Sequence, residues 1–301
     1  MTEQPKLSRA TRLAKWLVSG PPFVFLLLFF VAPAIIMVLA SFRYPGEFGG
    51  LAPLLADAQT LHGLTVETYQ FFFSDTIYAY VFLKSILVAL ATTLICLLLA
   101  YPLALLIARS PKQSRDLMVL LVVLPFASNF LVRVYAWMII LGPQAAFSQA
   151  VNGVLVALGM EPVHLLFSPF AVLVGMVYVH LPFMVLPLYT NLEKHDPALL
   201  DAAQDLGANG WQRFWRVTFP LSLPGIFSGS ALVFIPVLGM FAIPDILGGT
   251  GDMLIGNLIK EQFLGTRDWP FGSTLSIMLT ITVLLIVWLT TRVAGKGRRY
   301  A

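Results

Sequence analysis

The sequence predicts an all-α polytopic membrane protein with six transmembrane helices. Its composition, its long apolar segments and the placement of its positive charges all point to this class. Of the 301 residues, 58% are hydrophobic and 11% are charged, whereas an average soluble domain has about 25% charged residues. So few charged groups cannot cover the surface of a soluble chain of this length, and the composition therefore argues against a soluble protein.

Six segments are long and apolar enough to cross a bilayer as helices. Such a helix needs about 20 mainly apolar residues to cross about 30 Å of hydrocarbon, and lipid tolerates only backbone whose polar groups are paired internally. The predicted spans are Phe23–Phe42, Phe82–Ala108, Leu117–Leu141, Phe167–Thr190, Leu221–Ile243 and Gly272–Thr291. Two shorter apolar pieces, Phe147–Leu158 and Met253–Phe263, are predicted to form short helices at the membrane surface or over a cavity.

The positive charges gather on one side of these six spans. Most Lys and Arg residues lie in the N-terminal tail, in the loops after the second and fourth spans, and in the C-terminal tail. The positive-inside rule makes these regions cytoplasmic. This predicts cytoplasmic tails at 1–20 and 294–301 and a membrane domain at 21–293. A cleavable signal peptide is the alternative for the first span, although its apolar run exceeds the usual length of about 7–15 residues.

The sequence lacks the motifs of familiar enzymes and cofactor sites. It contains no G-x-x-x-x-G-K-[ST] phosphate loop, no H-E-x-x-H and no G-x-S-x-G. Its single cysteine, Cys96, excludes a disulfide within the chain and a cysteine-based metal site. The net charge of +4 is accounted for by the cytoplasmic loops and tails. We therefore predict no catalytic residue, no metal, no cofactor bound by this chain and no nucleic-acid partner.

One cytoplasmic segment, 196–220, is unusually long and polar for a loop of a helical bundle. Asp196-Pro197 is typical of a helix start, with Asp as the cap and Pro at the first helical position. Gly207 allows a sharp exit from that helix. A second short helix is predicted at Trp211–Val217, ended by Pro220. Two short helices joined by a glycine turn would form a knob that a partner can approach closely.

The same segment carries a signature. It reads Asp201-Ala202-Ala203, then Gly207, then Val217-x-Phe219-Pro220. This resembles the E-A-A, three residues, G, nine residues, I-x-L-P signature of permease subunits of ATP-binding-cassette (ABC) importers, with Asp, Val and Phe replacing Glu, Ile and Leu. In that family the segment is the coupling helix, which docks on a separate ATPase that binds the ATP. The resemblance implies that the ATPase contact involves Asp201, Ala202, Ala203, Gly207, Arg213 and Pro220.

A longer resemblance covers nearly the whole chain and is weakest in the first external loop. The stretches NFLVRVYAWMIIL, HLPFMVLPLYTNLEKHDPALLDAAQDLGA, MLIGNLIKEQFL and RDWPFGS are similar to permeases of polyamine (spermidine/putrescine) importers. This implies a second permease subunit of similar fold, two ATPase subunits, a periplasmic solute-binding protein and the lipid of a bacterial inner membrane. The chain would form half of the translocation path. The alternatives are an importer of another amino compound (opine, 4-aminobutyrate or aminophosphonate), a secondary transporter and a membrane enzyme.

Several polar residues near the spans are candidates for that path. Asn129 and Arg133 lie four residues apart, which would place them on one helix face in the third span; positioning of the helix near the lipid headgroups is the alternative role. Acidic groups near aromatic rings suit ammonium groups through ion pairing and cation–π contact. Asp245 is the strongest candidate because it lies nearest the hydrocarbon, although a solvated acidic loop is the alternative. The remaining candidates are Tyr135, Asp268 and Trp269.

Overall fold

The computed structural model describes residues 9–53 and 63–297. Within these ranges the chain is helices and loops, and its one β feature is an isolated bridge between Pro45 and Leu51, so the all-α prediction is confirmed. Among the described residues, five helices are long and apolar enough to span a membrane, and a bent pair of helices makes a sixth if it is counted as one span. The predicted tail residues 1–8 and 298–301, and residues 54–62 of the first external loop, lie outside the described residues.

The chain divides into two compact units. The first consists of residues 1–74 and 261–278, and the second of residues 75–260 and 279–301. The last long helix, α14 (Trp269–Gly297), begins in the first unit and ends in the second. The coupling segment and Asp245 both belong to the second unit.

The first unit is held together by polar and aromatic contacts between helices. Ser41 Oγ lies 2.8 Å from the hydroxyl of Tyr69, and Thr274 Oγ1 donates to Thr68 Oγ1 at 3.0 Å. Besides the start of α14, its elements are α1 (Arg9–Leu26), a π-helical turn (Leu27–Val31), α2 (Ala32–Ser41), α3 (Glu67–Ser74) and a second π-helical turn (Glu261–Gly265). Helix α1 therefore begins within the predicted 1–20 tail and continues without a break into the first span.

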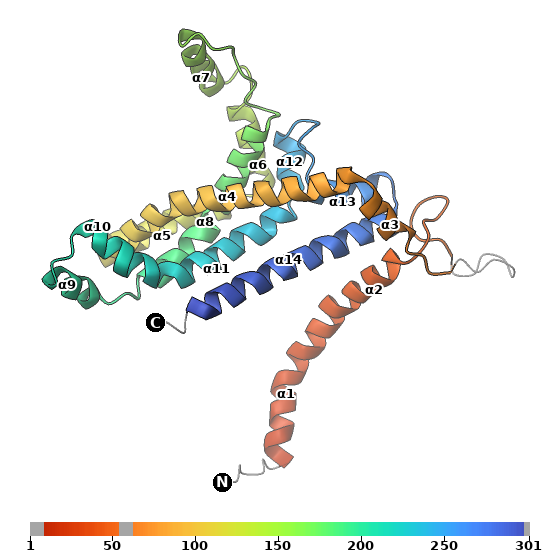
Figure 1. Ribbon diagram of the computed structural model, residues 1–301, viewed down its shortest axis with the longest axis horizontal. Coiled ribbons are helices and arrows are strands. Elements are labelled where there is room, and N and C mark those ends of the chain that lie inside the picture. The colour runs from red at the N-terminus through yellow and green to blue at the C-terminus, as the bar shows by residue number, and fades with distance from the viewer. Residues whose placement is uncertain (1–8, 54–62, 298–301) are drawn as a thin grey trace. The chain divides into compact units, whose positions relative to one another are not determined.

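Three long helices form the core of the second unit. They are α4 (Thr76–Arg109), α8 (Pro169–Leu192) and α11 (Phe219–Leu238), which pack side by side (Figure 1). Helix α4 turns small, fully buried residues inward: Ala89, Cys96, Ala100 and Ala104. Small residues let helix backbones approach closely, which is how membrane helices gain packing energy without a hydrophobic driving force.

The shorter elements of the second unit surround this core. They are α5 (Lys112–Val123), a 3₁₀ turn (Leu124–Ala127), α6 (Phe130–Ile140), α7 (Ala146–Ala157), α9 (Pro197–Asp205), α10 (Gly210–Arg213), a π-helical turn (Phe214–Thr218), α12 (Ala242–Leu247) and α13 (Ile255–Lys260). Figure 1 shows α7 beyond the end of α6, away from the three central helices. Both predicted short helices, at 147–158 and 253–263, are thus present as α7 and α13.

The third predicted span is wrong as a single straight helix. The chain bends by 91° between Lys112–Ala127 and Phe130–Ile140. The first piece tightens into the 3₁₀ turn at Pro125, and Asn129 then caps the second piece by accepting the backbone N–H of Leu131 at 2.8 Å. Proline removes a helical hydrogen bond, and a capping side chain satisfies the new helix start, so the break is built into the sequence.

Candidate coupling segment and translocation path

The predicted knob at 196–220 has the expected local structure. The Asp196 carboxylate accepts the backbone N–H of Ala198 at 2.9 Å and so caps α9. Gly207 has a φ of +80° at the end of the helix, and the N–H of Ala208 donates to the carbonyl of Ala203 at 3.0 Å. This is the hydrogen-bond pattern of a glycine-terminated helix. The helix start and the turn predicted from the sequence are both confirmed.

Further polar contacts fix α10 relative to α9. Asn209 and Gln212 form a reciprocal capping box at the start of α10. The guanidinium of Arg213 donates to Gln204 Oε1 at 2.6 Å. Arg213, which we assigned to the ATPase contact, therefore also ties the two short helices of the knob to each other.

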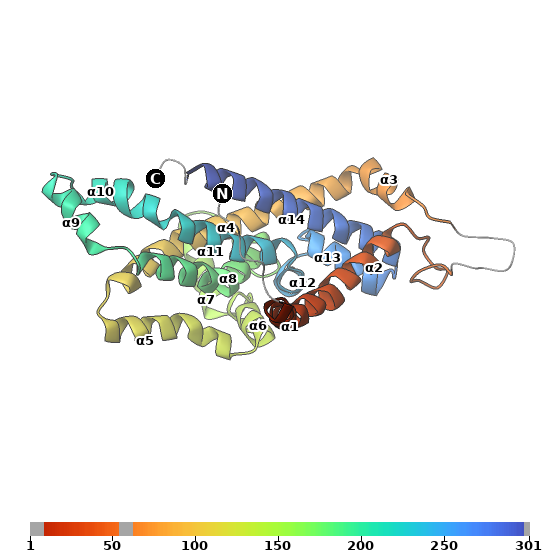
Figure 2. The same ribbon diagram turned by 90° about the horizontal axis from the view of Figure 1, so that it is seen from below.

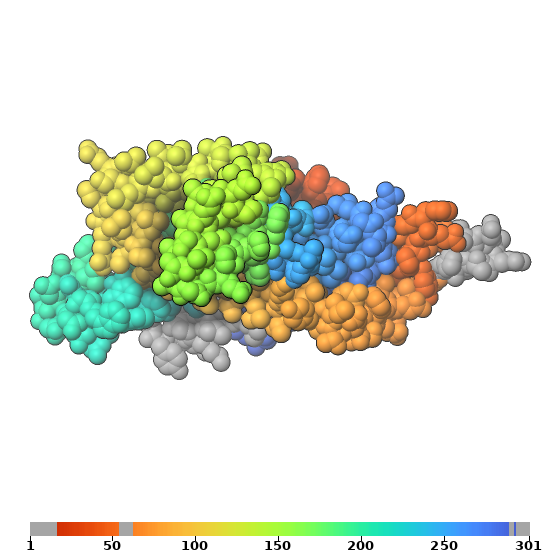
Figure 3. Space-filling model, turned by 90° about the horizontal axis from the view of Figure 1, so that it is seen from above, coloured from red at the N-terminus to blue at the C-terminus, as the bar shows by residue number. Residues whose placement is uncertain are grey.

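The knob presents its residues outward. Helix α9 contains no buried residue, and Leu206 and Trp211 are 89% and 71% exposed. Of the signature residues, Asp201 and Ala202 are exposed and Ala203 is half-buried. In Figure 2 the two helices lie together at the end of α11, and Figure 3 shows this part of the chain (turquoise) protruding from its unit. Such exposed apolar side chains are typical of a surface that a partner covers.

The second helix of the knob runs directly into a membrane span. Residues Gly210–Leu238 form one continuous helix, so the prediction that Pro220 ends the second short helix is wrong. The helix widens into the π turn at Phe214–Thr218, and the N–H of Phe219 reaches back to the carbonyl of Phe214. The π turn changes the hydrogen-bond register just before Pro220, which lies at the start of α11, where a missing N–H is tolerated.

Aromatic and polar contacts attach the knob to the core. The Tyr101 ring on α4 lies 5.6 Å from that of Phe214, and the Tyr101 hydroxyl lies 2.9 Å from Ser222 Oγ on α11. Trp215 and Phe219 extend the aromatic cluster, with ring centroids 5.0 Å apart. A cavity of about 460 Å³ lies between α9 and the ends of α4 and α8. Helix α9 is therefore attached mainly through its neighbours in the chain, while the π turn is packed against the core.

The broken third span changes how its polar residues are placed. Asn129 is the cap of α6 and does not share a continuous helix with the preceding span. Arg133 lies 5.4 Å from the centroid of the Phe126 ring, a cation–π contact across the bend. Tyr135 is exposed on α6, which packs against α12. The straight span is therefore wrong, but the four-residue offset is kept. The N–H of Arg133 donates to the carbonyl of Asn129 at 3.3 Å, so the two residues lie one turn apart at the start of α6.

Asp245 on α12 is bound by two side chains of α13. Lys260 Nζ donates to Asp245 Oδ2 at 2.6 Å, and Asn257 Nδ2 donates to Asp245 Oδ1 at 2.5 Å. Helix α12 packs closely against Gly175 of α8, where a Cβ atom would lie 2.6 Å from the side chain of Leu247. The sequence analysis missed Asn257 and Lys260 as partners of Asp245. Opposite charges 15 residues apart on either side of a Gly-Gly turn were the available signal.

The other predicted acidic residue, Asp268, belongs to the first unit. Its carboxylate accepts the backbone N–H of Phe271 at 3.0 Å, so it caps the start of α14. Trp269, the first residue of that helix, is 46% exposed. The structure thus gives Asp268 a local structural role beside its predicted role in the path.

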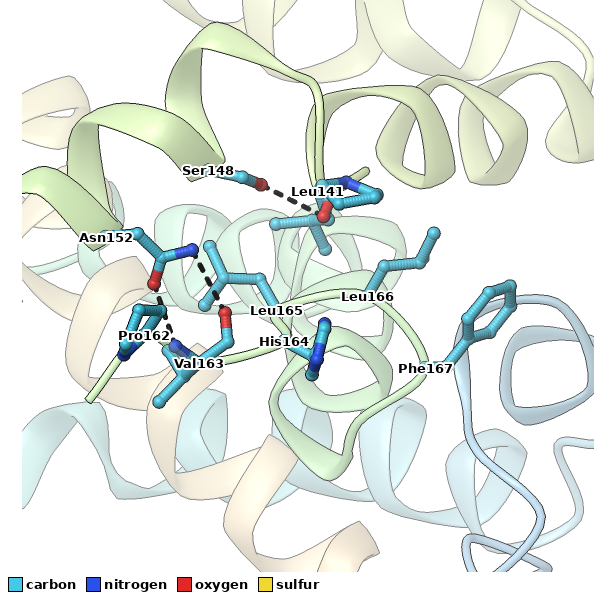
Figure 4. A pocket seen from close by; sticks show the side chains of 10 residues that line it. Leu141, Ser148, Asn152, Pro162, Val163, His164, Leu165, Leu166 and Phe167 are labelled. Atoms are coloured by element: carbon cyan, nitrogen blue, oxygen red, sulfur yellow. Dashed lines mark hydrogen bonds between the residues drawn. The ribbon is translucent and has the colours of Figure 1, made fainter.

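A second cavity lies beside α7. It has a volume of about 450 Å³, and Figure 4 shows it between α7 and the loop that follows. The Asn152 side chain holds that loop through two hydrogen bonds to the backbone of Val163, at 2.9 and 3.2 Å (Figure 4). Helix α7 therefore lines a cavity, which agrees with one of the two positions predicted for the short helix at 147–158.

Comparison with known proteins agrees with this architecture. Residues 100–295 match the family described as "binding-protein-dependent transport system inner membrane component". The spermidine/putrescine transport system permease protein PotB of Salmonella typhimurium is 45% identical over 227 residues, which cover 74% of this chain and 78% of that protein. PotB of Haemophilus influenzae is 39% identical over 274 residues, 90% of each chain.

A solved structure supports the fold independently. A chain of a bacterial ABC transporter involved in the import of the acidic polysaccharide alginate superimposes with a TM-score of 0.67, over 96% of this chain and 99% of that one. At 19% identity this likeness bears on the fold alone. With the family match and the identity to the two relatives, it leads to one conclusion: the chain belongs to the binding-protein-dependent transport system inner membrane components, and it is a permease component of an ABC importer.

Proposed function

We propose that this permease forms half of the translocation path of a polyamine importer in a bacterial inner membrane. The observation that carries the proposal is the identity of 39–45% to spermidine/putrescine permeases over 74–90% of the chain. Its partners would be a second permease subunit, two ATPase subunits that bind the ATP, and a periplasmic solute-binding protein. Both termini and the 196–220 knob would face the cytoplasm, as the positive-inside rule requires.

The exposed knob would dock on the ATPase. Asp201, Ala202 and the exposed Leu206 and Trp211 form the surface that the partner covers. Since α10 continues into α11, a displacement of the docked knob acts directly on a core helix. ATP binding to the partner would then shift the population of the bundle between its inward-open and outward-open forms, because a ligand can favour only the state it binds better.

The substrate assignment rests on charge as well as on the relatives. Asp245 offers a carboxylate on α12, and the ring of Tyr135 lies on the neighbouring helix α6. Such groups suit ammonium ions through ion pairing and cation–π contact. A permease for another amino compound, such as an opine, 4-aminobutyrate or an aminophosphonate, is the alternative, and such a permease would not depend on two separated ammonium groups in its substrate.

Uptake into vesicles tests the proposal. The complete complex is reconstituted with ATP on the ATPase side and the loaded binding protein on the other side. We expect uptake of labelled putrescine or spermidine, with weak competition from 4-aminobutyrate. Transport of a neutral or anionic amino compound without polyamine transport would reject the substrate and leave the permease assignment intact.

A further inference from the structure

The two partners of Asp245 differ in how firmly they are held. The side-chain amide of Asn257 is 93% buried with its residue: Nδ2 also donates to the carbonyl of Phe241 at 2.9 Å, and Oδ1 accepts the N–H of Leu254 at 3.1 Å. Its position is therefore fixed by the backbone. By contrast, the side chains of Lys260 and Asp245 are 37% and 31% exposed.

An ion pair this exposed is readily exchanged. Such pairs contribute at most about a factor of five to an equilibrium constant, the equivalent of about 1 kcal/mol. Asp245 Oδ1 is thus oriented by a fixed amide, while Oδ2 accepts from the ammonium of a lysine whose side chain is 37% exposed. The arrangement provides a carboxylate that is pre-oriented in the absence of substrate and has one oxygen available for exchange.

The group that occupies Oδ2 has the chemistry of a polyamine end. Lysine carries a primary ammonium on a flexible four-carbon stem, which matches one end of putrescine. We propose that Lys260 is a tethered stand-in for the substrate, and that a polyamine ammonium displaces it from Asp245 Oδ2 during transport. This inference rests on the proposed polyamine function. The exchange leaves the carboxylate paired before and after, and the displaced Lys260 side chain is 37% exposed, so its ammonium can be hydrated.

A second lysine–aspartate pair in the same unit lacks this exchangeable character. Lys84 Nζ lies 3.6 Å from Asp252 Oδ1, and their side chains are 21% and 12% exposed. Lys84 also donates to the carbonyl of Gly251 at 2.5 Å, and Asp252 Oδ2 accepts the N–H of Gly249 at 3.0 Å. Lys84 and Asp252 are therefore both less exposed than Lys260 and Asp245. This pair serves as a matched control.

Thiol modification at position 260 tests the exchange directly. The purified complex carrying Lys260→Cys is placed in lipid nanodiscs and treated at low salt with a cationic reagent, 2-aminoethyl methanethiosulfonate, or a neutral one, methyl methanethiosulfonate. The native Cys96 is fully buried, so its background reaction is low. We expect the cationic reagent to react with the new thiol up to about fivefold faster in the presence of Asp245 than in Lys260→Cys/Asp245→Asn, the factor that an exposed ion pair allows.

Competition by substrate gives the decisive comparison. Putrescine should slow the cationic reagent several-fold, and 1,4-butanediol, a neutral molecule of similar length, should not. Neither compound should affect the neutral reagent, or the cationic reagent in a complex carrying Lys84→Cys. A purely structural Lys260–Asp245 pair would give no putrescine-specific protection at position 260, which would overturn the inference.

Wild-type uptake separates this inference from the proposed function. Polyamine transport by the wild-type complex without protection at position 260 overturns the tethered stand-in alone. Absence of both transport and protection overturns the two together.

Discussion

Gly207 provides a strict test of the coupling segment. Its φ of +80° is left-handed, and a Cβ atom built there would meet no heavy atom within 4 Å. The requirement for glycine is therefore conformational within this chain. A residue with a Cβ in this region costs about 1–2 kcal/mol, and a β-branched residue is a genuine outlier there. Gly207→Val should therefore lower the population of the correctly turned knob by a factor of about 5–30.

Binding of the ATPase measures this change. The purified ATPase subunit is titrated onto the permease pair in nanodiscs, and the Kd should rise about 5–30-fold for Gly207→Val. Folding of the membrane core should be unaffected, because α9 contains no buried residue. Gly207→Asn should bind nearly normally, since Asn tolerates the left-handed region. Gly210→Val is a second control, because Gly210 has no positive φ and also has open space around it.

Two results would refute this reasoning. Normal binding by Gly207→Val would show that the glycine turn does not present the docking surface. A loss of binding in Gly207→Asn equal to that in Gly207→Val would show that the partner approaches the glycine backbone too closely for any side chain, which is a steric requirement rather than a conformational one.

Three further predictions concern topology, substrate and packing. Phe48 and Leu206 are 92% and 89% exposed, so cysteines placed there should be labelled differently in intact cells. An impermeant maleimide should label only position 48, and labelling at position 206 would contradict the predicted orientation. Asp245→Asn removes a carboxylate–ammonium contact worth up to about 1 kcal/mol at this exposure, so polyamine uptake should fall up to about fivefold. Stimulation of the ATPase by the loaded binding protein should persist, and unchanged uptake would remove Asp245 from the path. Gly229→Leu places a Cβ 2.8 Å from the sulfur of Met184, so overpacking should destabilise the fold by about 1–3 kcal/mol. The Tm of the purified complex should therefore fall, and an unchanged Tm would contradict the close packing of α8 and α11.

Local signals in the sequence were sufficient for the elements that depend on local chemistry. The cap at Asp196 and the left-handed Gly207 were predicted correctly because each is decided by a few neighbouring residues. The long apolar runs gave the second, fourth and sixth spans. The helix of the second span, α4, begins earlier than predicted, at Thr76, because Asp75 caps it by accepting the N–H of Ile77 at 2.9 Å.

The errors arose where hydropathy and helix geometry compete. Residues 117–141 are mainly apolar, so a hydropathy window indicates one span and does not detect the break at Pro125 and Asn129. Pro220 was read as a helix end, but the preceding π turn lets the helix pass through it. The Asp245–Lys260 pair joins two short helices through a loop, and no periodic pattern specifies such a contact.

Close contacts lead without interruption from the coupling segment to Asp245. The helix that leaves the knob packs against α8, where a Cβ on Gly225 would lie 2.8 Å from Asn191. Helix α8 in turn receives Leu247 of α12 against Gly175, and α12 carries Asp245. Densely packed interiors have few voids in which a displacement can be absorbed. The cavity beside α9 leaves room for that helix to move, whereas the π turn and α11 are packed against the core. A shift of the docked knob therefore reaches α8 and α12 through α11, and the partly exposed Asp245–Lys260 pair at the end of that series costs little free energy to change.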